Sequence, residues 1–150
     1  MMATDAQSLQ DWLLANGFDP ANLELPGSNG DTALMKATQA GEATIVRSLI
    51  QTGANLNARN HDGNNALWFA CFRDRIDLMQ VLLDAGIDLD NQNDNGATAL
   101  MYSASAGKTE ILKTLLAAGA NTQLKNLDDF QAIDFAANRE ILGILKHDGV

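Results

Sequence analysis

Apolar and polar positions along this chain recur with a long, fixed period. Residues 30–60 read GDTALMKATQAGEATIVRSLIQTGANLNARN, and residues 63–93 and 96–126 align with them position by position. The glycines are evenly spaced in two series that share this period, Gly30, Gly63 and Gly96, and Gly53, Gly86 and Gly119. A period of this length is typical of a protein built from repeated structural units. Each copy is therefore expected to fold into the same small unit.

Each copy predicts two helices joined by a short turn. The first helix is expected to begin near Thr32, Asn65 or Thr98, because these side chains accept hydrogen bonds at helix N-termini. Gly41 and Gly107 mark its end in two copies. The second helix carries apolar residues at the spacing of a buried stripe, namely Ile45, Val46, Leu49 and Ile50, then Ile76, Leu78, Met79, Leu82 and Leu83, then Ile111, Leu112, Leu115 and Leu116. The glycine that follows is expected to take a left-handed conformation as a C-terminal cap.

Turn-forming dipeptides separate one copy from the next. Asn29-Gly30, Asp62-Gly63 and Asn95-Gly96 each precede a first helix. Such pairs favour tight turns with positive φ. The sequence therefore predicts a protruding, hairpin-like finger before each first helix.

The segments TALMKA, NALWFA and TALMYS, together with GEATIVRSLIQTGANLNA, resemble the ankyrin repeat. The resemblance spans residues 27–146 and implies an all-α solenoid of helix-turn-helix units with hairpin-like fingers. The chain departs from the T-P-L-H pattern of the family, since alanine replaces proline in all three copies and Met35, Trp68 and Met101 stand where histidine is usual. We expect the cap hydrogen bonds of that histidine to be missing and the fold to be retained.

We expect a single domain over residues 1–150, with three full repeats between two capping units. The boundaries are 1–26 for the N-terminal cap helix and loop, 27–59, 60–92 and 93–125 for the repeats, and 126–150 for a shortened C-terminal cap repeat. Repeats contact only their neighbours, so the two terminal units are expected to present more polar outer faces.

The two caps are incomplete copies of the repeat. In the N-terminal segment, Leu9, Trp12 and Leu13 form the apolar stripe of a second helix that has no first helix before it. In the last copy, Glu140-Ile141-Leu142 corresponds to Glu110-Ile111-Leu112 of the copy before. The two tripeptides are 30 residues apart instead of 33, so three residues are missing between the helices of the last copy. We expect that copy to keep its turn and its first helix.

The stretch NNALWFACFRDR places three aromatic residues around Cys71. With about 100° of rotation per residue, Leu67 and Cys71 share one side of the helix with two alanines, and Trp68, Phe69 and Phe72 fall on the opposite side. In the ankyrin-like arrangement, that outward side of the first helices lines a concave groove, which the family commonly uses to bind proteins.

Several interpretations of these side chains stay open. Met35, Trp68 and Met101 hold the same position in successive repeats, and we call such a set of positions a column. Trp68 either faces the groove or fills the gap between adjacent first helices, as the two methionines of its column suggest. Phe69 and Phe72, with Tyr102 one repeat further on in the column of Phe69, are large aromatics on a solvent-facing side and indicate partner contact.

Cys71 shares its column with the small residues Thr38, Ala104 and Ala137, which favours a structural thiol in close helix packing. A reactive thiol is the alternative. No histidine lies within nine residues of Cys71 to activate it.

Aspartates gather at the predicted fingers. They are Asp31, Asp62, Asp94, Asp128 and Asp129, opposed there by Arg59 and Lys125. Aspartate suits turns, which explains the cluster without a function. The alternative is an acidic rim beside the aromatic groove, which would speed encounter with a basic, partly apolar segment of a partner.

The overall composition narrows the partner class. Nineteen acidic against ten basic residues give a net charge of −9, which disfavours nucleic acid and anionic membranes. One cysteine forms no internal disulfide, and no apolar run approaches the roughly 20 residues that span a bilayer. We therefore expect a cytoplasmic protein that is a monomer on its own.

Metal, cofactor and catalytic patterns are not found. The segment DAGIDLDNQNDNG has its glycine at the wrong offset for a calcium loop, and Ala99 stands where a bidentate glutamate is needed. His61 and His147 have neither a neighbouring cysteine nor a helical histidine partner, so there is no zinc signature. We expect no enzymatic activity, no metal and no cofactor.

The function predicted from the sequence is a non-enzymatic protein-protein interaction module, an adaptor or regulator that docks a partner in its groove and finger surface. A redox sensor or enzyme using Cys71, and a structural subunit of a larger assembly, are the alternatives. The candidate partner-binding residues are Asp31, Lys36, Gln39, Asp62, Asn64, Trp68, Phe69, Phe72, Arg73, Asp94, Tyr102 and Ser105.

Overall fold

The computed structural model describes residues 5–148 of the chain. It consists of two compact units, Met1–Ile87 (unit 1) and Asp88–Val150 (unit 2). All regular secondary structure in the described residues is helical, which confirms the all-α prediction. None of the helices in this part of the chain is long and apolar enough to cross a membrane.

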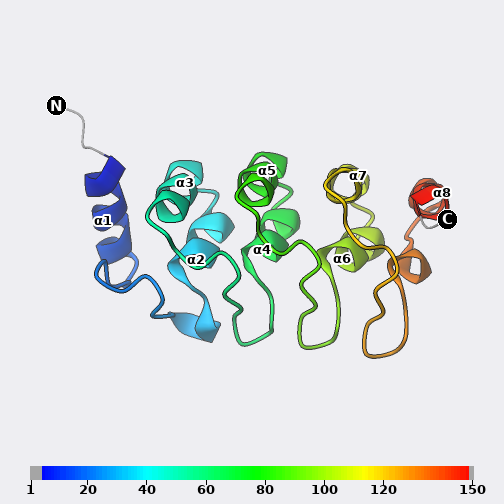
Figure 1. Ribbon diagram of the computed structural model, residues 1–150, viewed down its shortest axis with the longest axis horizontal. Coiled ribbons are helices and arrows are strands. Elements are labelled where there is room, and N and C mark those ends of the chain that lie inside the picture. Colours follow the sequence, from blue (N-terminus) through cyan, green and yellow to red (C-terminus); the bar gives the residue numbers. More distant parts are fainter. Residues whose placement is uncertain (1–4, 149–150) are drawn as a thin grey trace. The chain divides into compact units, whose positions relative to one another are not determined.

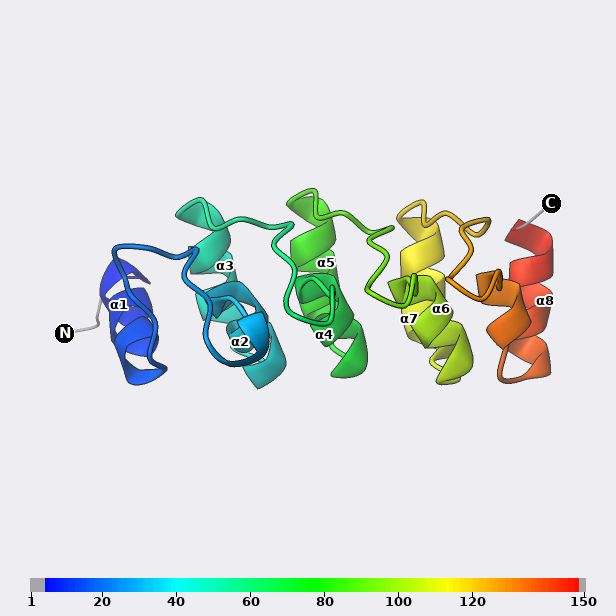
Figure 2. The same ribbon diagram turned by 90° about the horizontal axis from the view of Figure 1, so that it is seen from below.

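The described part of unit 1 contains α-helices and one 3-10 turn. They are α1 (Asp5–Ala15), η1 (Ser28–Gly30), α2 (Ala33–Ala40), α3 (Ala43–Gln51), α4 (Ala66–Phe72) and α5 (Ile76–Asp84). The first helices α2 and α4 pack side by side, and each also packs on its own second helix, α3 or α5. Helix α1 packs on α3 and so covers the open side of the first repeat (Figures 1 and 2).

Unit 2 repeats the arrangement with a shorter last copy. It contains α6 (Ala99–Ser105), α7 (Thr109–Ala117), the 3-10 helix η2 (Ala132–Phe135) and α8 (Arg139–Asp148). Helix α6 packs on α7 and η2, and α8 packs on η2 and α7. The last copy keeps its turn, but its first helix is reduced to the 3-10 helix η2.

Helix ends mostly follow the predicted caps. Thr32 Oγ1 accepts a hydrogen bond from Met35 N at 3.2 Å, and Thr98 Oγ1 accepts one from Met101 N at 3.1 Å. Asn65 occupies the N-cap position of α4, as predicted, but its side chain makes no cap hydrogen bond. The C-terminal glycines take the expected left-handed conformation, with φ of 90° at Gly53, 94° at Gly86 and 98° at Gly119.

The buried stripe of the second helices forms the core of each unit. Leu49 and Leu82 in unit 1 and Leu115 in unit 2 are 0% exposed. Ile76, which the sequence placed in this stripe, is 40% exposed, so that assignment is wrong. It begins α5 at the position that Ala43 holds in α3, before the first buried turn of the helix.

Each finger is a five-residue turn whose two ends are joined by a backbone hydrogen bond. The fingers are residues 27–31 and 60–64 in unit 1, and residues 93–97 and 126–130 (the last finger) in unit 2. In each, the N–H of the first residue donates to the carbonyl of the fifth, at 2.8 to 3.0 Å. In Figure 1 the fingers extend beyond the first helices of their unit. The predicted hairpin-like fingers are therefore confirmed.

Neighbouring fingers within a unit are joined through their backbones. His61 N–H donates to Asn29 O at 2.9 Å in unit 1, and Leu127 N–H donates to Asn95 O at 3.0 Å in unit 2. Gly30, with φ of +72°, is required at this contact, since an added Cβ would lie 2.6 Å from a ring carbon of His61. Asp129 takes the glycine position of the last finger, with φ of 71°.

Candidate functional site

The aromatic residues of α4 form one cluster. The ring of Trp68 stacks on that of Phe72, with centroids 5.3 Å apart and an interplanar angle of 13°. Phe69 meets Trp68 edge to face, with centroids again 5.3 Å apart. Phe72 is 53% exposed, whereas Leu67 on the other side of the helix is 1% exposed. The two faces predicted for this helix are therefore confirmed.

The aromatic cluster forms one wall of a hollow of about 420 Å³ in unit 1. Its lining residues come from α2, α4 and the two fingers of the unit, and are Asn29, Asp31, Gln39, Asp62, Asn64, Trp68, Phe69, Phe72 and Arg73. Every one of these except Asn29 was a candidate from the sequence. The structure thus brings eight of the twelve predicted residues together in one concavity.

Hydrogen bonds fix the carboxylates at this hollow. Asp31 accepts from Gln39 Nε2 at 2.8 Å and from Asn60 Nδ2 at 2.9 Å, so it ties its finger both to α2 and to the next finger. Asp62 accepts from Asn29 Nδ2 at 2.9 Å. Asp31 is half-buried and Asp62 is exposed. Asp31 therefore has a structural part, and Asp62 is the carboxylate more open to a partner.

Asn29 lines the hollow but was not among the residues predicted from the sequence, although a signal was available. Asn29 lies exactly one repeat before Asp62 and therefore at the same place in its finger. Its amide donates to Asp62, which is one of the hydrogen bonds that join the two fingers. Extending the finger column by one repeat would have found it.

Lys36 lies on α2 in the column of Phe69 and is exposed, but it does not line the hollow. In unit 2, Asp94 and Ser105 are exposed and Tyr102 is half-buried. The ammonium of Lys108 lies 5.4 Å from the centroid of the Tyr102 ring, within the range of a cation–π contact. A continuous patch from Phe69 to Tyr102 stays a prediction.

Two aromatic residues of unit 2, Phe130 and Phe135, were also not among the residues predicted from the sequence. Phe135 lies one repeat after Tyr102 and so continues the column of Phe69. Phe130, in the last finger, meets Phe135 edge to face with centroids 6.0 Å apart, and it is 49% exposed. The period that found Tyr102 would have found Phe135.

Trp68 combines its two interpretations. Its column partners Met35 and Met101 are 1% and 3% exposed, so that column belongs to the core in the other copies. Trp68 itself is half-buried, and its ring lines the hollow. A larger side chain at the same position therefore both packs inward and reaches the hollow.

Cys71 is 0% exposed, which confirms the prediction of a buried thiol. We expect a thiol reagent to label the folded protein at least about 100-fold more slowly than the unfolded chain, because labelling requires local or global opening. Time courses in buffer and in denaturant measure the two rates. Cys71→Ala is expected to leave partner binding unchanged. Equal labelling rates would instead support the redox-sensor hypothesis.

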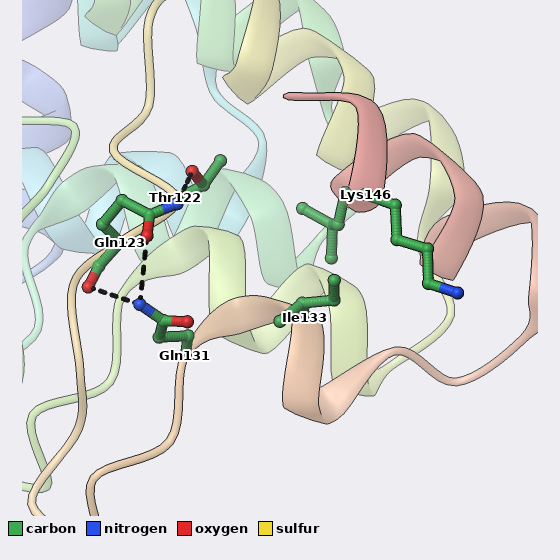
Figure 3. Close-up of a pocket in the computed structure, with 6 residues that line it drawn as sticks. Thr122, Gln123, Gln131, Ile133 and Lys146 are labelled. Carbon is green, nitrogen blue, oxygen red and sulfur yellow. Dashed lines mark hydrogen bonds between the residues drawn. The ribbon is translucent and has the colours of Figure 1, made fainter. Parts of the chain in front are cut away.

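A second hollow of about 200 Å³ lies in unit 2 (Figure 3) and is lined by Thr122, Gln123, Gln131, Ile133, Leu145 and Lys146. Gln131 Nε2 donates to the backbone carbonyl of Gln123 at 3.1 Å and to its side-chain Oε1 at 3.3 Å. The ammonium of Lys146 points away from Ile133 in Figure 3. Lys146 is the one charged residue among those that line this hollow.

Unit 1 also contains an ion pair between Arg75 and Asp77, with Nη2 and Oδ2 2.8 Å apart. The Arg75 guanidinium, which donates to both oxygens of Asp77, lowers the pKa of that carboxyl to about 2. This exposed pair at the start of α5 does not line the hollow. In the described part of the chain, no group of three or more histidine, cysteine, aspartate or glutamate side chains is placed to hold a metal ion.

The chain was compared with known families and structures. A family model described as ankyrin repeats (3 copies) matches residues 1–93 and 76–150. The crystal structure of the ankyrin repeat domain of Bcl-3, described as a unique member of the IkappaB protein family, superposes with a TM-score of 0.82 at 24% sequence identity. The match covers 97% of this chain and 68% of the other. A search of curated proteins found no match.

Proposed function

The chain belongs to the ankyrin-repeat family, whose repeats generally act as protein-protein interaction modules, and from this premise we propose that it binds a partner protein in the hollow of unit 1. The partner presents a basic, partly apolar segment, and the chain acts as a non-enzymatic adaptor or regulator. One observation carries the proposal: three aromatic rings and two aspartates line the same concavity.

The aromatic wall supplies the affinity in this proposal. Large aromatic side chains in a concave site are the residue type most enriched among binding hot spots. The stacking of Trp68 on Phe72 restricts both rings before a partner binds, which reduces the side-chain entropy lost when a partner covers them. An apolar side chain of the partner would lie against the exposed face of Phe72.

The carboxylates supply selectivity. Asp31 and Asp62 lie at the finger side of the hollow, and Arg73 is the one basic residue among those that line it. The net charge of −9 adds a long-range attraction for basic surfaces. A basic segment is therefore favoured over an acidic one both at encounter and in the complex.

We also propose that the protein is a monomer on its own and that it works in the cytoplasm. The support for this is that the only cysteine is buried, so the fold holds together by packing alone and needs no oxidising compartment.

Capture from the source cell tests the proposal. The bait is the immobilised chain, compared with the double variant Phe69→Ala, Phe72→Ala. The matched control is Leu14→Ala, because Leu14 is 59% exposed on α1 of the same unit but lies outside the hollow. The wild type and the control are expected to recover the same partner, and the double variant to lose it. Equal recovery by all three baits would place the binding site elsewhere.

A kinetic prediction tests the acidic rim. Replacing Asp62 and Asp94 with asparagine is expected to slow association with the partner and to weaken its dependence on salt, with little change in dissociation. The control is Asp11→Asn with Glu110→Gln, which removes the same charge from exposed helix positions. Surface plasmon resonance at several salt concentrations separates the two rates. If association does not change, these two aspartates only form turns.

A further inference from the structure

The last finger differs in chemistry from the other three. We call Leu127, Phe130 and Phe135 the C-terminal finger patch. At the position of Leu127 the earlier fingers carry Ser28, His61 and Asp94, and at that of Phe130 they carry Asp31, Asn64 and Ala97. The last finger alone therefore places two large apolar side chains where the others are polar or small.

Packing within the fold does not account for this change. Leu127 is 77% exposed, so it buries little apolar surface and contributes little to stability. Phe130 makes an edge-to-face contact with Phe135 but stays 49% exposed. Among the described residues of unit 2, Leu127 and Phe130 are the exposed large hydrophobics. Exposed apolar residues that gather in one place mark an interaction surface.

The backbone of the finger offers a pairing edge. A residue of the later finger donates its N–H to the earlier finger in each unit, as His61 does to Asn29 O and Leu127 does to Asn95 O. Asp128 lies one repeat after Asn95 and so holds the corresponding carbonyl. An extended segment whose N–H reaches this carbonyl would continue the same contact.

The charge around the patch indicates the partner. Three exposed carboxylates lie near the patch: Asp128 and Asp129 in the last finger, and Asp134 in η2. The nearest base in the sequence is Lys125, directly before the finger. Carboxylates beside the apolar tip repel anionic lipid headgroups, and a second copy of this acidic chain would bring like charges together. A segment with lysine or arginine complements both features.

We propose that the C-terminal finger patch binds an extended segment of a partner protein in which an apolar side chain is flanked by basic residues. The apolar side chain packs against Phe130 and Leu127, the basic residues lie beside Asp128 and Asp129, and the backbone pairs at the carbonyl of Asp128. This surface belongs to unit 2, so it does not depend on the hollow of unit 1.

Amide chemical shifts in an NMR titration test this inference. The probe is a short synthetic peptide in which lysine alternates with leucine and phenylalanine, and an all-lysine peptide of equal charge is the control. The variant Leu127→His, Phe130→Asn gives the last finger the residues that the second finger has at these positions, His61 and Asn64. Because a finger of this fold already carries them, the variant is expected to fold. We expect the amide signals of residues 126–135 to shift when the leucine- and phenylalanine-containing peptide is added to the wild type. The variant is expected to bind this peptide at least about tenfold more weakly than the wild type does. Phe72→Ala is expected to have no effect on this binding.

Other outcomes would overturn the inference. Shifts confined to other residues, equal binding of both peptides, or equal binding to the variant would each exclude apolar anchoring at the patch. Sedimentation with anionic vesicles that depends on Leu127 and Phe130 would assign the patch to a membrane. Dimerisation of the wild type that the variant abolishes would assign it to a second copy. Because the wild-type titration maps the site by itself, a poorly folded variant would not prevent the decision.

Discussion

Replacing Leu67 with alanine is expected to lower the free energy of unfolding by about 2–5 kcal/mol, because it removes buried methyl groups and leaves a cavity. Leu67 is 1% exposed in α4, a helix that packs against both α2 and α5. Urea unfolding followed by circular dichroism measures the loss.

The matched control for Leu67→Ala is Phe72→Ala on the same helix. Phe72 is 53% exposed, so its truncation is expected to cost less than about 1 kcal/mol. Phe69→Ala falls between the two, since Phe69 is half-buried. If Phe69→Ala and Phe72→Ala each lower the free energy of unfolding as much as Leu67→Ala does, the aromatic rings belong to the core and the proposed site loses its basis.

Much of this fold is predictable from the sequence because its contacts are local and repeated. The fixed period of the repeat places the helices, and the left-handed glycines such as Gly53 end them by a local steric preference. The prediction failed at positions where one copy departs from the repeated pattern. Ile76 is apolar at a helix start that faces solvent, and the deletion in the last copy reduced its first helix to η2.

The candidate site was predictable to the extent that it follows helical geometry. The rotation per residue alone placed Phe69 and Phe72 opposite Leu67, and the structure bears this out. The links between Asp31 and the side chains of Gln39 and Asn60 were not foreseen, because they join a finger to a helix and to the next finger. Such side-chain pairs depend on how the repeats stack, which a single sequence does not specify.

The largest expected effect on function comes from the aromatic residues of α4 and α6. Truncating Phe69, Phe72 or Tyr102 to alanine is expected to weaken partner binding by about 2 kcal/mol or more in at least one case, the range of a central aromatic anchor. Phe72 is the strongest candidate, because it lines the hollow and is 53% exposed, so a partner would remove much of its ring from water. Isothermal titration calorimetry with the captured partner gives the three affinities.

The control and the stability measurements decide what a change in affinity means. Leu14→Ala removes an equally exposed side chain from α1 and is expected to leave affinity unchanged. A loss of affinity counts for the hollow only where the variant melts at nearly the wild-type temperature, since a destabilised repeat would weaken binding indirectly. Unchanged affinity in all three aromatic variants would move the partner site away from α4 and α6. A loss seen with Tyr102→Ala alone would place the site in unit 2, where the C-terminal finger patch also lies.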